Sequence, residues 1–147
     1  MKFPVSIPFV DTLGLELLRF EGGQAEIAIE LREELCNAFM VAHGGVIMSL
    51  LDVVMAHAAR SPNQPGVSAD DQRGVVTIEM KTSFMRPGLG RLVAHGQLKH
   101  RTVSMAFCEG SVFDAAGKLA AHATGTFKYV RALPITGRKI NALNGSD

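Results

Sequence analysis

One long apolar stretch restricts the fold more than any other feature of the chain. It covers residues 46–59 of the segment GGVIMSLLDVVMAHAAR at 44–60 and is longer than an ordinary strand. The sequence therefore predicts a single long helix over 44–60. Ser49, Asp52 and His57 interrupt the stretch, so it is unsuited to cross a bilayer. An apolar helix that stands alone in a chain needs another element to cover it.

Short extended segments flank the helix on both sides. Two of them, 15–20 and 24–30, are joined by Gly22 and Gly23, a dipeptide that suits a tight hairpin. After the helix an alternating pattern predicts further strands near 75–85, 90–101, 103–113 and 118–130. Between helix and strands, residues 61–74 hold two prolines and two glycines, which predicts a mobile loop. We expect an α+β fold in which an antiparallel sheet of about six strands wraps one central helix.

The chain length and composition allow one domain with a packed core. The protein has 147 residues, of which 47% are apolar. We assign residues 1–131 to this domain and residues 132–147 to a loose C-terminal tail. A net charge of +1 does not by itself favour a polyanionic partner.

The N-terminus and the cysteines indicate where the protein works. Pro4, Pro8 and Asp11 interrupt any apolar region of a signal peptide. Cys36 and Cys108 lack the close spacing of a zinc or redox motif, so we expect two free thiols in a reducing compartment. The sequence thus predicts a cytoplasmic protein without a membrane segment or a bound metal.

Asp52 is the one charged residue between Gly44 and Ala59. An exposed helix face usually carries Lys and Glu, and Asp52 lies too far from the first turn to cap the helix. We therefore expect a functional acid at an interface, and a solvated acid on an ordinary amphipathic helix is the alternative. Steps of 100° per residue group Asp52 with mostly small side chains, which are Gly45, Met48, Ser49, Met55, Ala56 and Ala59.

Gly44 and Gly45 stand at the start of the helix. Glycines ease a chain into a helix, but N–H groups without a neighbouring Cβ can also polarise a carbonyl or hold an oxyanion. Because Gly45 and Asp52 share one helix face, the pair suits attack on an acyl group.

Asn37, the HGG at residues 43–45 and Asp52 together resemble the signature of hotdog-fold acyl-CoA thioesterases. The resemblance is to the branch with the phenylacetate-degradation and 4-hydroxybenzoyl-CoA thioesterase-like enzymes, and it extends from about residue 13 to residue 130. It implies homodimers whose sheets join edge to edge, with active sites shared between subunits. A tetramer built as a dimer of dimers is also expected.

The resemblance implies a role for each matching residue. Asp52 is the general base or the nucleophile toward the thioester carbonyl, and the Gly45 N–H of the other subunit polarises the carbonyl oxygen. Asn37 orients the thioester or the water, and His43 shapes the start of the helix. Thr77 matches a Ser/Thr position that holds the attacking water in some members.

Basic residues gather between positions 81 and 101, where the chain has no acid. They could receive the phosphates of coenzyme A through charge-assisted hydrogen bonds, although a solvated strand edge gives the same pattern. Few aromatic residues accompany them, so no nucleic acid is expected. CoA is part of the substrate, and no separate cofactor is expected. The predicted substrate-binding residues are Met48, Met55, Phe84, Arg86, Lys99 and Arg101.

The leading function is hydrolysis of an acyl- or aryl-CoA to the free acid and CoA. A non-catalytic acyl-CoA sensor would use the basic residues and the pocket but would leave Asp52 without a purpose. A hotdog hydratase or dehydratase pairs an Asp with a His in a different arrangement from that of His43 and Asp52. The sequence leaves open the acyl group and the choice between base and nucleophile.

Overall fold

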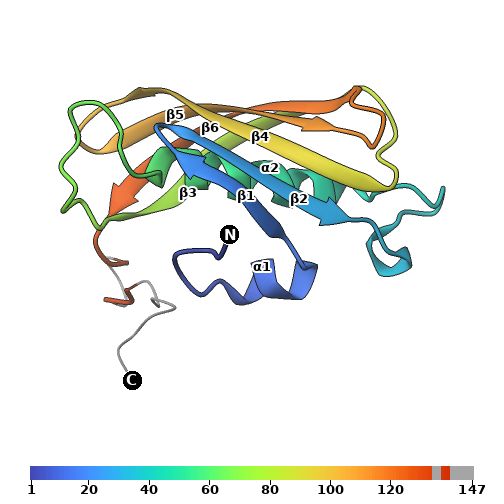
Figure 1. Cartoon of the computed structure of the whole chain (residues 1–147), viewed down its shortest axis with the longest axis horizontal. Coiled ribbons are helices and arrows are strands. Elements are labelled where there is room, and N and C mark those ends of the chain that lie inside the picture. The colour runs from blue at the N-terminus through green and yellow to red at the C-terminus, as the bar shows by residue number, and fades with distance from the viewer. Residues whose placement is uncertain (134–136, 140–147) are drawn as a thin grey trace.

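A six-stranded antiparallel sheet curls over one long helix, α2 (Gly44–Arg60), in the computed structural model, which describes residues 1–133 and 137–139 (Figure 1). A short helix, α1 (Pro8–Leu13), lies near the N-terminus. The 3-10 turn η1 (Glu33–Leu35) precedes α2. The strands are β1 (Glu16–Glu21), β2 (Gln24–Glu30), β3 (Gly74–Phe84), β4 (Arg91–Arg101), β5 (Met105–Phe113) and β6 (Leu119–Val130).

These elements confirm the predicted hotdog architecture, and all six strands fall close to their expected bounds. Most of the predicted tail, residues 134–136 and 140–147, lies outside the described residues. Within the described part of the chain, no helix has the length and apolar character needed to cross a membrane.

The strands are ordered β1-β2-β4-β5-β6-β3 across the sheet. Every pairing is antiparallel, and β1 and β3 form the two edges. The pairing of β3 with β6 shifts register between Thr77 and Glu79, as in a β-bulge. Because bulges turn side chains away from their regular directions, this shift affects where Thr77 points.

Helix α2 is buried on its bulky face against the sheet. A Cβ placed on Gly96 of β4 would lie 2.5 Å from the backbone oxygen of Val54, so glycine is needed where helix and strand touch. The buried helix residues are Ile47, Leu50, Leu51, Val53, Val54, Met55, His57, Ala58 and Ala59.

Two tight turns illustrate how local chemistry sets the strand ends. Gly22 and Gly23 have φ of 59° and 82°, the left-handed conformation expected of the β1–β2 hairpin. The β4–β5 turn has no glycine or proline. There the Thr102 hydroxyl accepts a hydrogen bond from Met105 N at 3.0 Å, so a side chain supplies the turn.

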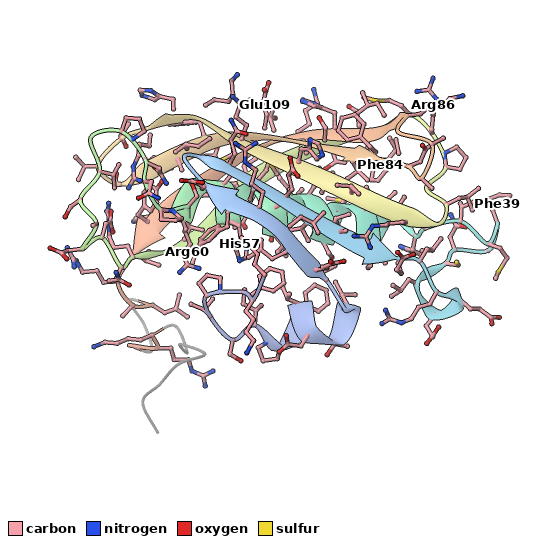
Figure 2. The ribbon with its side chains drawn as sticks, viewed as in Figure 1. Phe39, His57, Arg60, Phe84, Arg86 and Glu109 are labelled. Atoms are coloured by element: carbon pink, nitrogen blue, oxygen red, sulfur yellow. The ribbon has the colours of Figure 1, made fainter. Side chains whose placement is uncertain are left out.

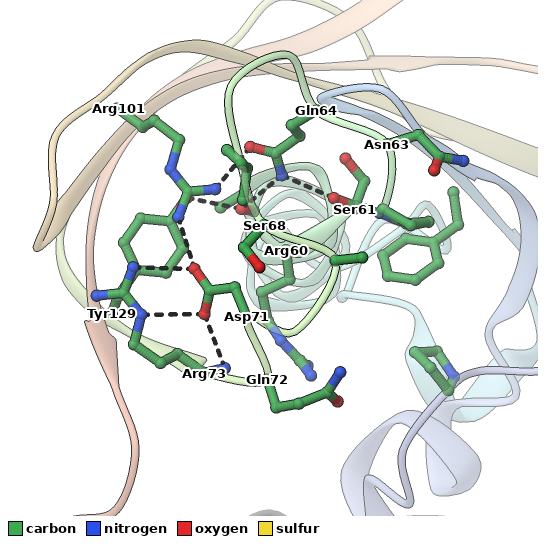
Figure 3. A pocket seen from close by; sticks show the side chains of 16 residues that line it. Arg60, Ser61, Asn63, Gln64, Ser68, Asp71, Gln72, Arg73, Arg101 and Tyr129 are labelled. Atoms are coloured by element: carbon green, nitrogen blue, oxygen red, sulfur yellow. Dashed lines mark hydrogen bonds and ion pairs between the residues drawn. The ribbon is translucent and has the colours of Figure 1, made fainter.

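The loop after α2 was expected to be mobile, but side chains tie it to the helix and the sheet (Figure 3). Arg101 donates to Gln64 Oε1 at 2.7 Å and to Asp71 Oδ2 at 3.2 Å, and its guanidinium lies 4.1 Å from the centre of the Tyr129 ring. Arg73 holds Asp71 from the other side at 3.0 Å. This network places the loop over the C-terminal end of α2.

Candidate functional site

The Asp52 carboxylate and the Thr77 hydroxyl meet between α2 and β3. Thr77 Oγ1 donates to Asp52 Oδ1 at 2.6 Å, a distance typical of a hydroxyl bound to a carboxylate. Asp52 is half-buried and Thr77 is exposed. The bond fixes one carboxylate oxygen, and no described residue donates a hydrogen bond to Oδ2. This second oxygen is therefore available to a water or a substrate.

A cavity of about 400 Å³ opens beside this pair. Its walls come from α2, from the start of β3 and from the N-terminal segment that carries Val5 and Ile7. Valine, isoleucine and alanine side chains form its apolar wall, and Asp52 and Thr77 are among the polar residues that line it. Such a cavity suits an apolar ligand whose reactive group lies beside the carboxylate.

His43 caps the start of α2 with its side chain. Its Nδ1 accepts a hydrogen bond from Gly45 N at 2.9 Å. The Gly45 N–H expected to polarise a carbonyl is therefore engaged within the chain. A carbonyl oxygen bound there would share or displace the His43 contact. Asn37 was expected to orient the thioester or the water. Within the chain its Oδ1 accepts a hydrogen bond from Phe39 N at 2.9 Å and forms a local turn.

A second cavity, of about 610 Å³, lies at this N-terminal end of α2. Asn37, Gly44 and Phe84 line it together with Phe39 and Arg86. Figure 2 shows Phe39, Phe84 and Arg86 at the same end of the molecule. Phe39 is 86% exposed and Phe84 is 51% exposed, so this end presents an uncovered aromatic surface.

The predicted site residues therefore fall into two groups within one chain. Asp52 and Thr77 line the first cavity, whereas Asn37, Phe84 and Arg86 line the second. Asp52 follows Gly45 by seven residues, which is about 10 Å along a helix axis. A thioester carbonyl in contact with Asp52 is therefore out of reach of the Gly45 N–H of the same chain.

The two methionines predicted to bind substrate lie in different environments. Met48 is 37% exposed and lies on the open face of α2, as predicted. Met55 is fully buried, and its side chain lies where Cβ atoms on Gly110 and Gly125 would be. Its predicted place in an acyl pocket is wrong, because these two glycines leave a hollow in the sheet that a long side chain fills.

Ala59 also differs from the expected open face. Its carbonyl accepts hydrogen bonds from the Tyr129 hydroxyl at 2.7 Å and from Gln64 Nε2 at 3.1 Å. The folded loop and β6 thus cover the last turn of the helix.

The basic residues between 81 and 101 do not form one patch. Arg91 and Arg101 stand at opposite ends of β4, which separates them by about 33 Å. Arg101 pairs with Asp71, and Lys99 Nζ lies 3.7 Å from Glu109 Oε2. Arg86 donates to Leu119 O at 3.1 Å. The absence of acids in the local sequence was misleading, because acids from other elements lie beside Arg91, Lys99 and Arg101.

Sequence reasoning missed Arg60 and His57, which line the same cavity as Asp52. His57 is 2% exposed, and burial lowers its pKa from 6.5 to about 4. Its Nδ1 lies 2.7 Å from Val53 O, so the neutral ring donates from Nδ1. Arg60 follows Asp52 by eight residues, a spacing that places both on one side of a helix. This spacing could have identified Arg60 from the sequence.

Comparisons with known proteins agree with this fold. The sequence profile of the thioesterase superfamily matches residues 39–121. A protein of Saccharolobus solfataricus named as a candidate esterase is 32% identical over 120 residues, 81% of each chain. The medium/long-chain acyl-CoA thioesterase YigI of Salmonella typhimurium is 29% identical over 85% of this chain and 87% of its own.

Solved structures show the same fold. A conserved protein of Pseudomonas aeruginosa superposes with a TM-score of 0.76 at 27% identity, over 86% of this chain and 97% of that one. The Escherichia coli PaaI protein from the phenylacetic acid degradation operon superposes with a TM-score of 0.73 at 21% identity, over 83% of each chain.

The architecture and the acid on the central helix define a hotdog protein of the thioesterase type. The chain belongs to the thioesterase superfamily, as its sequence predicted. The matched range includes the HGG segment, Asp52 and Thr77.

Proposed function

We propose that the protein is an acyl-CoA thioesterase, which hydrolyses an acyl- or aryl-CoA to the free acid and CoA. The observation that carries the proposal is the 2.6 Å bond from Thr77 to Asp52 on the wall of the 400 Å³ cavity. It orients a carboxylate toward a space that fits an acyl group. The superfamily match and the similarity to YigI support the same reaction.

In the proposed reaction, Asp52 acts on the thioester carbon either directly or through a water. As a base, Asp52 Oδ2 takes a proton while the water oxygen bonds to the carbonyl carbon. The carbon–sulfur bond then breaks, and CoA leaves as a thiolate that is protonated in solution. As a nucleophile, Oδ2 forms a mixed anhydride that water later hydrolyses. Thr77 positions the carboxylate in both routes.

We further propose that two chains complete each site. The 10 Å separation of Asp52 and Gly45 along α2 supports this arrangement, because a single carbonyl has to reach both groups. β3 is an edge strand that carries Thr77, so an edge-to-edge dimer through β3 would bring two copies together there. Asn37 and Phe84 would then contact the thioester held by the partner's acid.

The test is thiol release from a panel of aliphatic and aromatic acyl-CoAs. We expect release by the wild-type protein and its loss in Asp52→Ala and Asp52→Asn, with folding and CoA binding retained. Unchanged turnover in both variants would remove Asp52 from the reaction. Binding of CoA esters without release of thiol from any of them would indicate a sensor instead.

A further inference from the structure

The cavity beside Asp52 continues toward the C-terminal end of α2. Asp52, Ala56 and Arg60 all line it, at successive turns of the helix. Arg60 is eight residues beyond Asp52, which is about 12 Å along the axis. A thioester held at Asp52 would therefore extend its acyl chain past Ala56 toward the guanidinium of Arg60.

Arg60 has no hydrogen-bond or ion-pair partner among the described residues. Its Nε is buried without an acceptor, and Figure 3 shows no dashed line from its guanidinium to a neighbour. Burial also lowers the pKa of Arg60. Asp71 lines an adjoining cavity with Arg60, but its hydrogen bonds go to Arg73 and Arg101. A half-buried guanidinium without a counter-ion is costly, so an acceptor from a ligand would stabilise it.

The charges around this end of the cavity favour an anion over a neutral group. Lys139 lines the cavity as well and adds a second positive charge. Asp52 is the one acid in the described lining, and it lies at the opposite end bound to Thr77. His57 Nε2 is buried without a partner in the described part of the chain, and the His57 ring is neutral. The ring therefore adds no charge of either sign beside Arg60.

We propose that Arg60 binds a carboxylate at the far end of the acyl group, so that the preferred substrates are CoA thioesters of dicarboxylic acids of medium length. This inference rests on the proposed thioesterase function and adds a substrate class to it. The guanidinium donates from its two terminal nitrogens to the two carboxylate oxygens, a geometry that Arg forms readily. Arg60 thus determines specificity at a distance from the reacting carbon.

The test compares matched thioesters that differ only at the end of the chain. Octanoyl-CoA, its ω-carboxyl analogue and its ω-hydroxyl analogue are assayed by thiol release with the wild-type protein and with Arg60→Met. We expect the wild-type protein to prefer the ω-carboxyl thioester. Arg60→Met should lower kcat/KM for that thioester roughly 10- to 100-fold and change the value for octanoyl-CoA less than about 3-fold, because only the charged end loses its hydrogen bonds.

Two further variants separate a specificity role from a structural one. Arg60→Lys keeps the charge but loses the paired planar donors of the guanidinium, so we expect it to retain part of the preference. Arg19→Met removes an exposed arginine that does not line the cavity and should leave all three values unchanged. Thermal unfolding of each variant verifies the fold.

The outcomes distinguish this inference from the proposed function. Three results would overturn the carboxylate site and leave the thioesterase function intact. They are equal rates on octanoyl-CoA and its ω-carboxyl analogue, an equal loss of activity on both in Arg60→Met, or a preference for the ω-hydroxyl thioester. No thiol release from any thioester would refute the thioesterase. In that case calorimetric titration of the same three thioesters still tests Arg60, since tighter binding of the ω-carboxyl one supports the site and equal binding rejects it.

Discussion

The bond between Thr77 and Asp52 makes the most specific kinetic prediction. Thr77→Val replaces the hydroxyl with a methyl group of similar shape and removes the 2.6 Å contact. A hydrogen bond to a charged group contributes about 1.5–3 kcal/mol, which corresponds to roughly 10- to 100-fold in a rate constant. We expect kcat for acyl-CoA hydrolysis to fall by that factor. KM should change little, because Thr77 positions Asp52 rather than holding CoA.

Two controls on the same strand sharpen this measurement. Thr77→Ser keeps the hydroxyl and should recover most of kcat. Thr82→Val removes a buried hydroxyl that has no hydrogen-bond partner among the described residues, so it should leave kcat unchanged. Steady-state thiol release gives kcat and KM for each variant. A Thr77→Val enzyme with wild-type kcat, or a Thr82→Val enzyme with the same loss, would refute the positioning role.

Two predictions concern stability. The Arg73 and Arg101 guanidinium groups lower the pKa of Asp71 from 3.8 to about 2, so its carboxylate stabilises the fold above pH 3.8 and this contribution is lost as pH falls through 2. Asp71→Asn should therefore cost roughly 1–2 kcal/mol at pH 7, which lowers Tm by about 2–6 °C, and the difference from wild type should disappear below pH 2. The exposed neighbour variant Asp70→Asn serves as control, and an equal Tm for both at pH 7 would contradict the network. Gly96→Ala places a Cβ against the α2 backbone and should lower the free energy of unfolding, measured in urea, by about 1–3 kcal/mol. An unchanged urea midpoint would contradict the close contact between α2 and β4.

Local patterns in the sequence were enough to predict the strands and the central helix. Alternation placed Ala121, Ala123 and Phe127 on one side of the last strand, and all three are buried in β6. The β4–β5 turn was a weak boundary because a Thr102 side chain replaces the usual glycine or proline. Angular position along α2 identified Asp52 and Met48 on the open face but misplaced Met55.

The errors in the candidate site come from contacts between segments distant in the chain. The hollow that buries Met55 is made by glycines on β5 and β6, which the helix sequence does not reveal. The pairing of Lys99 with Glu109 depends on strand register. The matched family motif brought Thr77 into consideration. Its hydrogen bond to Asp52 follows from the position of β3 beside α2, which the sequence alone does not give.

The measurement that tests the account most directly is complementation between two inactive variants. Asp52→Asn removes the acid from one chain, and Gly45→Val blocks approach to the helix N-terminus of the other. The two are co-expressed with different affinity tags, and mixed dimers are isolated by sequential purification. If each site combines Asp52 of one subunit with Gly45 of its partner, a mixed dimer keeps one intact site of two and should hydrolyse acyl-CoA at about half the wild-type rate. Mixed dimers no more active than either parent would contradict a shared site.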